Sequence, residues 1–297
     1  MGTLSAAAVT AKRYFAAGFS LVSRRRGTYV LLTVLYVTPA LLAALLTVLI
    51  QEPNVWQQAL LYLLRSITVV LGTLAVMVMV SFHAHGQDMS IAHASRLGVY
   101  WIFRYLWTNA HTSLIFWVPT TILISLHARQ AEVFPLAGAF QPLADGIWWL
   151  VIGAAALAIH TRTMLAPFYA VHGNMPGTLA TIESWRSSGR SFWTCLSTLV
   201  LASAPVAIPL GIAGGSLFLA LTSAQRALFL LALPDLTWAA IQLIRPLLIP
   251  AVYGLYKDFW EKEAAGRTAG DLLATAPNLA RPLLALTRPL PHFGRWE

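Results

Sequence analysis

Charge is scarce in this chain. Only 10% of its 297 residues are Asp, Glu, Lys or Arg, and 58% are apolar, whereas about 25% charged residues are usual in a soluble domain. A surface that faces water cannot easily be built from so few charges. The composition therefore argues against a soluble enzyme or a nucleic-acid-binding protein, and it indicates an integral membrane protein.

Cysteines and acidic residues are also few. Cys195 is the only cysteine, which excludes an internal disulfide and a Cys-rich metal site. No paired carboxylates fall within the apolar runs, and Asp235 lies at the outer edge of one. An ion-coupled pump is expected to bury at least one acid. The chain also lacks a G-x-S-x-G, a P-loop and a dinucleotide fingerprint, so we expect no enzyme activity and no cofactor.

Long apolar runs dominate what is present. The predicted fold is an all-α polytopic membrane bundle with about six transmembrane helices and further amphipathic interfacial helices. Residues 1–28 form the first interfacial segment, residues 29–258 the six-span membrane domain, and residues 259–297 a Pro-containing tail. The six expected spans are Tyr29–Ile50, Gln57–Phe82, Leu106–Leu126, Ile147–Tyr169, Cys195–Leu221 and Leu236–Tyr256.

Two amphipathic stretches separate the spans. They are His83–Tyr105 and Val171–Trp193, and residues 224–234 predict a short interfacial helix on the opposite side. With six spans, fifteen Lys and Arg residues fall on the side of the two termini, and Arg65, Arg129 and Arg226 fall on the other. The positive-inside rule then places both termini in the cytoplasm.

Two arginines within the apolar runs are the first candidate site residues. Arg162 and Arg245 each begin an R-x4-P motif, ending at Pro167 and Pro250. An ionised Arg in hydrocarbon normally faces the bundle, a water-filled cavity or a headgroup. One interpretation is a basic cleft that binds a lipid headgroup or another anion. The alternative is that each side chain snorkels to the headgroups or caps carbonyls freed by the nearby proline.

Histidines are the second candidates. His83, His85 and His172 lie on or near the expected cytoplasmic face, and imidazole is a natural ligand for zinc and other transition metals. The His-x-His spacing is weakly specific, and no H-E-x-x-H motif accompanies it. We therefore treat these residues as weak metal candidates beside the simpler interpretation that they are interfacial side chains.

A longer pattern connects the fourth span to the stretch after it. Residues 162–193 read R-x4-P-x-Y-x3-G-x2-P-x3-A-x3-S-W-x3-G-x2-F-W, and the last span ends in Leu255-Tyr256-Lys257-Asp258, followed by Gly270-Asp271-Leu272. These motifs resemble the six-helix bacterial membrane domain that is found fused to glycerophosphodiester phosphodiesterases and as stand-alone proteins. An acidic residue is common in that family where this chain has His172. No catalytic domain follows here, so the resemblance does not imply hydrolase activity.

The favoured function is a non-enzymatic scaffold or accessory subunit of a bacterial cytoplasmic-membrane assembly, with membrane lipids and membrane proteins as expected partners. The first alternative is a transporter or permease-like component for a lipid or small amphiphile. A membrane enzyme is a third, resting on the histidines alone.

Overall fold

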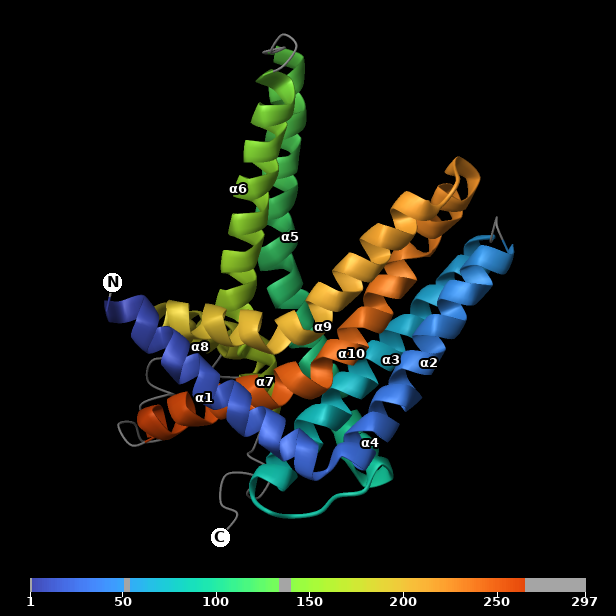
Figure 1. Ribbon diagram of the computed structural model, residues 1–297. Helices are drawn as coiled ribbons and strands as arrows, with labels where there is room; N and C mark the ends of the chain where they lie inside the picture. The colour runs from blue at the N-terminus through green and yellow to red at the C-terminus, as the bar shows by residue number, and fades with distance from the viewer. Residues whose placement is uncertain (1, 51–53, 134–139, 265–297) are drawn as a thin grey trace. The chain divides into compact units, whose positions relative to one another are not determined.

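The apolar runs fold into long helices. The computed structural model describes residues 2–50, 54–133 and 140–264, and within these ranges it contains helices and no strand (Figure 1). The helices are α1 (Gly2–Arg24), α2 (Arg26–Ile50), α3 (Val55–Ala84), α4 (Ile91–Tyr100), α5 (Ile102–Val133), α6 (Phe140–Thr163), α7 (Ala166–Val171), α8 (Gly177–Arg190), α9 (Phe192–Ala220) and α10 (Ser223–Ala264). The all-α class predicted from the sequence is confirmed.

Five segments of these helices are long and apolar enough to cross a membrane. They are Arg26–Thr47, Val55–Ala84, Leu143–Val171, Phe192–Ala220 and Ala239–Trp260. The other expected span, Leu106–Leu126, is helical within α5 but is not among the five. Polar residues such as Asn109, His111 and Thr112 lower the hydropathy of α5. The chain is therefore a multi-pass membrane protein with five candidate spans by length and composition.

Two units make up the fold, and each is described by itself. The first unit comprises Met1–Phe103 and Ser197–Asp258, and the second comprises Arg104–Leu196 and Phe259–Glu297. In the first unit, α3 packs against α2 and α4. Its core includes the run from Leu74 to Val80 on α3, which is buried on all sides. In the second unit, α8 packs against α6 and α7.

Helix ends follow local signals in the sequence. Asn54 caps α3 through a reciprocal pair of hydrogen bonds with Gln57, and Ser90 accepts from the backbone N–H of His93 at the start of α4. Such caps satisfy amide groups that the first turn of a helix leaves without partners. Gly86 follows α3 with a φ of 76°, a conformation that glycine adopts without steric cost.

One expectation about helix boundaries differs from the structure. Residues 224–234 form no separate helix, because α10 runs without interruption from Ser223 to Ala264. The first expected stretch, His83–Tyr105, contributes the ten-residue helix α4, and the second contributes α8. Of the expected tail, residues 265–297 lie outside the described residues.

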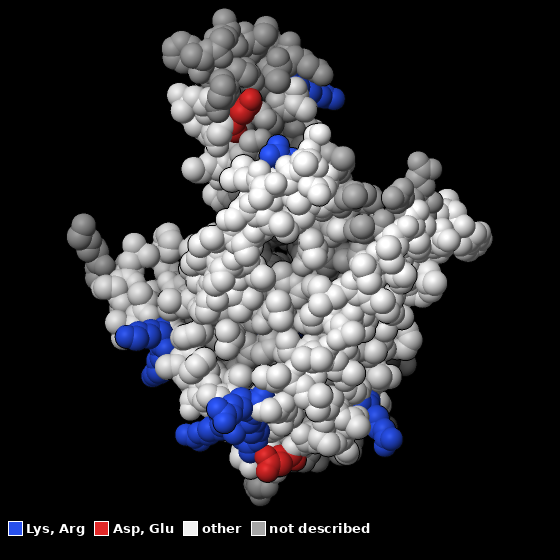
Figure 2. Space-filling model, turned by 45° about the vertical axis from the view of Figure 1, so that its right-hand side comes forward, with Lys and Arg blue, Asp and Glu red and all other residues white. Residues whose placement is uncertain are grey.

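The surface agrees with a membrane environment. On the face drawn in Figure 2, charged side chains are few and form small groups, separated by broad tracts that carry none. Large apolar side chains are exposed along α2, α5, α6 and α9, including Leu31, Trp117, Leu150 and Ile212. Exposed apolar area of this extent is unusual in a soluble monomer and suits contact with lipid.

Candidate functional site

Arg162 lies where the fourth expected span breaks. Helix α6 ends at Thr163 and α7 begins at Ala166, with Pro167 in its first turn. Proline has no N–H to donate to the carbonyl four residues earlier, so the helix cannot continue normally at this point. The interruption leaves backbone groups that need partners from elsewhere.

Two serines of α8 supply those partners. The Ser184 hydroxyl donates to the Arg162 carbonyl at 2.8 Å and accepts from the Leu165 N–H at 3.2 Å. The Ser188 hydroxyl donates to the same carbonyl at 3.0 Å. Both serines are fully buried. The side chains of α8 therefore bridge the break between α6 and α7.

The guanidinium of Arg162 lies on the surface of α8. Its Nη1 donates to the Trp185 carbonyl at 3.2 Å, and its Cζ lies 5.5 Å from the Trp185 ring centroid and 5.6 Å from that of Phe192. A Cβ atom at Gly189 would overlap the guanidinium, so the glycine makes room for it. The Ser184-Trp185-x3-Gly189 part of the sequence pattern thus forms the contact surface for Arg162.

Arg245 belongs to the first unit and is more deeply buried. Its side chain is 6% exposed, and Nη1 donates to Oε1 of Gln242, one turn earlier on α10. A Cβ atom at Gly72 of α3 would lie 3.0 Å from both of these atoms and from Cγ of Tyr36 on α2. The Tyr36 hydroxyl is 2.9 Å from the hydroxyl of Ser95 on α4. Four helices of the first unit therefore contribute to this polar cluster.

The two arginines occupy different environments. Arg162 is half-buried in the second unit, and Arg245 is buried in the first. The α6–α7 helix breaks between Arg162 and Pro167, whereas α10 stays continuous through Arg245 and Pro250. The R-x4-P repeat seen in the sequence does not correspond to a repeated local structure. A cleft shared by the two arginines stays a prediction.

The histidines each have a local neighbour. His83 Nδ1 is 3.1 Å from the Tyr29 hydroxyl, His85 Nδ1 is 2.7 Å from the Ser81 carbonyl, and His172 stacks on Phe168. Within the described ranges, no three His, Cys, Asp or Glu residues are grouped so that they could hold a metal ion. The metal hypothesis gains no geometric support from this part of the chain.

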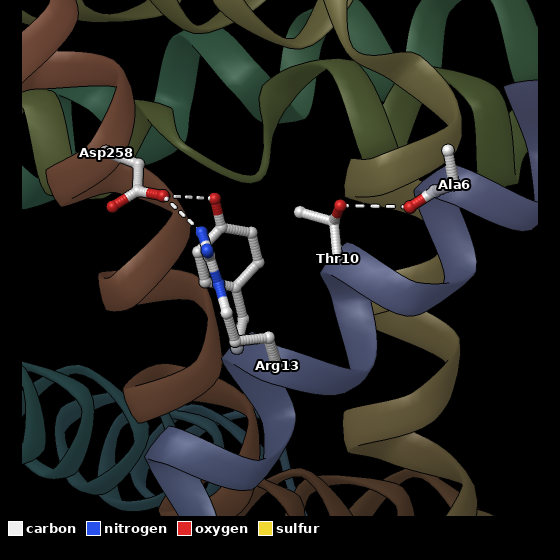
Figure 3. Close-up of polar contacts among 5 residues, drawn as sticks. Ala6, Thr10, Arg13 and Asp258 are labelled. Carbon is white, nitrogen blue, oxygen red and sulfur yellow. Dashed lines mark hydrogen bonds and ion pairs between the residues drawn. The ribbon is translucent and has the colours of Figure 1, made fainter.

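Asp258 is a site residue whose role sequence analysis missed. Its Oδ2 accepts from the Tyr14 hydroxyl at 2.5 Å and lies 3.1 Å from Arg13 Nη2 (Figure 3). Burial, and then the hydrogen bond to Asp258, raise the pKa of Tyr14 to about 12. The L-Y-x-D motif indicated that Asp258 matters, but no pattern in the sequence pointed to its partners on α1.

Close backbone contact holds α1 beside that carboxylate. A Cβ atom at Gly18 would lie 2.8 Å from the backbone nitrogen of Ala251, and one at Gly254 would lie 3.4 Å from the Tyr14 ring. Ala7, Ala11 and Tyr14 are buried on the same side of α1. The N-terminal helix is therefore anchored on the end of α10 by small residues, a hydrogen bond and an ion pair.

A second ion pair joins the α1–α2 junction to the turn after α3. Arg25 places Nη2 2.7 Å and Nε 2.8 Å from Oδ1 of Asp88. Asp88 is exposed, so the pair is expected to contribute little to stability, about 0–1 kcal/mol.

One acid is buried, contrary to the expectation from the sequence. Glu183 of α8 is 7% exposed; its Oε2 lies 3.5 Å from Arg186 Nη1, and its Oε1 is buried without a hydrogen-bond partner in the structure. Its helical position explains the burial, because Ala180, Ser184 and Ser187 on the same side of α8 are buried as well. The sequence pattern alone did not indicate this burial, since the packing of α8 decides which of its sides is covered.

Comparisons with protein-family models, with curated proteins and with solved structures found no match to this chain. The residues described above therefore carry the functional argument.

Proposed function

We propose that this protein is a non-enzymatic scaffold or accessory subunit of a bacterial cytoplasmic-membrane assembly, and that it binds anionic lipid headgroups. In this proposal both termini are cytoplasmic, and the chain is a stand-alone relative of the six-helix membrane domain that its motifs resemble. The observation that carries the lipid-binding part is the division of α8 into two chemically different faces.

The inward face of α8 is structural. Ser184 and Ser188 close the break between α6 and α7, and Ser187 lies 2.7 Å from the Tyr169 hydroxyl. The outward face exposes Ile182 and Trp185 to 45% and 42%. Arg186 and Arg190, also exposed, follow at helical spacing.

This outward face suits the headgroup region of a bilayer. Apolar and aromatic side chains enter the acyl boundary, while arginines beside them attract anionic lipids. Arg162 adds a third guanidinium next to Trp185. Arginine can bind a phosphate through two parallel hydrogen bonds, which lysine cannot do.

Native mass spectrometry of the protein extracted in a neutral detergent tests the proposal. We expect wild type to retain phosphatidylglycerol in preference to phosphatidylcholine. The double variant Arg186→Gln/Arg190→Gln should weaken this retention by about tenfold or more, because each basic residue near an anionic surface contributes about 1 kcal/mol. Arg129→Gln, an exposed arginine of α5, is the matched control and should behave as wild type.

Equal retention of both lipids by wild type, or an equal loss in the control variant, would refute the lipid-binding proposal. The same spectra test the scaffold part, because an accessory subunit should carry a stoichiometric protein partner out of its native membrane.

Glu183 favours a second candidate, a transporter for a lipid or small amphiphile. A buried carboxyl oxygen without a protein partner can receive a proton or a cation during a transport cycle. In proteoliposomes, such a protein should move a fluorescent lysolipid between leaflets faster than empty vesicles do, and Glu183→Gln should slow this movement. Equal rates with and without protein would eliminate the candidate.

A further inference from the structure

Helix α1 is attached to one end of two candidate spans. It ends at Arg24, and the span of α2 begins at Arg26. The Tyr14 hydroxyl donates to Asp258, which lies in the last turn of the span Ala239–Trp260. Figure 1 shows α1 crossing α10 and diverging from α2. Because both attachments are to the ends of spans, α1 is held at the level where those spans leave the hydrocarbon.

Two neighbouring sides of α1 have different surroundings. The first side is buried, and its Tyr14 and Gly18 contact α10. The second side, called here the Leu4–Phe19 stripe, consists of residues at helical spacing that are exposed or half-buried: Leu4, Ala8, Lys12, Phe15 and Phe19. Leu4 and Phe19 are 50% and 53% exposed, and the ring centroids of Phe15 and Phe19 lie 6.1 Å apart. An apolar side beside an anchored side suits a helix that lies on a bilayer.

The basic residues of this region divide into two groups. Arg13 is paired with Asp258, and Arg25 is paired with Asp88. Three others are exposed and form no ion pair with the residues that the structure describes: Lys12, Arg24 and Arg26. Residues 1–28 contain no Asp or Glu. The second group therefore presents positive charge that the described acids do not neutralise.

We propose that α1 is a binding surface for an anionic phospholipid leaflet. The Leu4–Phe19 stripe enters the boundary between headgroups and acyl chains, and Lys12, Arg24 and Arg26 bind the phosphate groups. Basic amphipathic helices bind anionic membranes through this combination of apolar contact and charge. The two spans already hold α1 beside such a leaflet. This contact belongs to the first unit and goes beyond the α8 surface, so neither depends on the other.

Fluorescence quenching of the full chain in vesicles tests the geometry. The vesicles contain phosphatidylcholine and phosphatidylglycerol, and a bimane label is attached at Phe19→Cys. Ala17→Cys carries the control label, because Ala17 is exposed on the opposite side of α1. We expect a lipid with a nitroxide on its acyl chain to quench the Phe19→Cys label and water-soluble acrylamide to quench the Ala17→Cys label. Wild type, whose single cysteine is buried, is the labelling blank.

The triple variant Lys12→Gln/Arg24→Gln/Arg26→Gln tests the charge. Trace amounts of nitroxide phosphatidylglycerol and nitroxide phosphatidylcholine are compared in the same host vesicles, so the surface charge stays constant. Phosphatidylglycerol should quench the Phe19→Cys label more effectively. Since each basic residue near an anionic surface changes the preference by about fivefold, the triple variant should lower it by about tenfold or more. Arg186→Gln/Arg190→Gln, on α8, should leave it unchanged.

Each of the other results would overturn the inference. Equal acrylamide quenching at the two labels would place the Leu4–Phe19 stripe in water. Protection of the Phe19→Cys label from both quenchers would show that protein, either a second copy or another chain, covers it. Equal quenching by the two nitroxide lipids, an unchanged preference in the triple variant, or a matching loss in the α8 variant would exclude the contact of α1 with anionic headgroups. Phosphatidylglycerol retention that depends on Arg186 and Arg190 would still support the α8 surface, so this failure is separate from failure of the proposed function.

Discussion

Replacing Ser184 with alanine should destabilise the second unit more than any other single hydroxyl deletion on α8. The Ser184 hydroxyl is fully buried, donates to the Arg162 carbonyl and accepts from the Leu165 N–H. In Ser184→Ala the carbonyl keeps the hydroxyl of Ser188, but the N–H loses its bond to the serine. A buried N–H that is left without a hydrogen-bond partner costs about 1–3 kcal/mol.

We therefore expect the free energy of unfolding to fall by about 2 kcal/mol, which corresponds to a change of about thirtyfold in the unfolding equilibrium. Unfolding in mixed micelles with increasing dodecyl sulfate, followed by tryptophan fluorescence, measures it. Ser188→Ala is the matched control. The Ser188 hydroxyl also bonds to the Ser184 carbonyl of its own helix. Removing this hydroxyl leaves no N–H without a hydrogen bond, so the free energy of unfolding should fall by about 1 kcal/mol or less.

The double variant then tests the bridge itself. With both hydroxyls removed, the Arg162 carbonyl loses both serine partners, so the combined cost should exceed the sum of the single costs by about 1 kcal/mol. If Ser184→Ala costs no more than Ser188→Ala, or if the two costs simply add, the serines do not close the helix break.

Three further outcomes are expected. Gly189→Ala should displace the Arg162 guanidinium and lower the unfolding temperature, with a cost of about 1–3 kcal/mol for overpacking. Gly153→Ala is the control and should leave the unfolding temperature unchanged, because a methyl group there meets open space. Because the pKa of Tyr14 rises from 10.0 to about 12 on folding, its stabilising contribution is complete below pH 10 and is lost as the pH rises toward 12. In Tyr14→Phe the unfolding temperature should fall less steeply over this pH range. An equally steep fall in the variant would contradict the assignment. A double-mutant cycle of Arg25→Gln and Asp88→Asn should give a coupling below about 1 kcal/mol that falls further in 1 M salt, and a coupling insensitive to salt would show that the pair is shielded from solvent.

Helix periodicity and apolar runs predicted the class of fold correctly, because a membrane span must satisfy its backbone internally and therefore forms a helix. They did not predict where helices continue. Pro167 coincides with a break and Pro250 does not, although each ends an R-x4-P motif. At Pro167 the difference has a visible tertiary cause: Ser184, nineteen residues beyond Leu165, supplies the hydrogen bonds that the break needs.

The candidate site was predicted only in part. Arg162 and Arg245 were found because charge within an apolar run is rare. Their surroundings were not predicted, since Gly72 and Arg245 are far apart in the sequence and no local pattern links them. The burial of Glu183 was not predicted for a different reason. An acid on an amphipathic helix is expected to face solvent until the packing of that helix is known.

The docking of α1 on α10 has a consequence for biosynthesis. The Tyr14 hydroxyl and the Asp258 carboxylate are 244 residues apart in the chain, so α1 leaves the ribosome long before its partner on α10 has been made. At a synthesis rate of about 5–20 residues per second, α1 waits for roughly 12–50 s. During that interval its alanine- and glycine-lined side is uncovered, and the nascent chain depends on the lipid surface or on the insertion machinery to shield it.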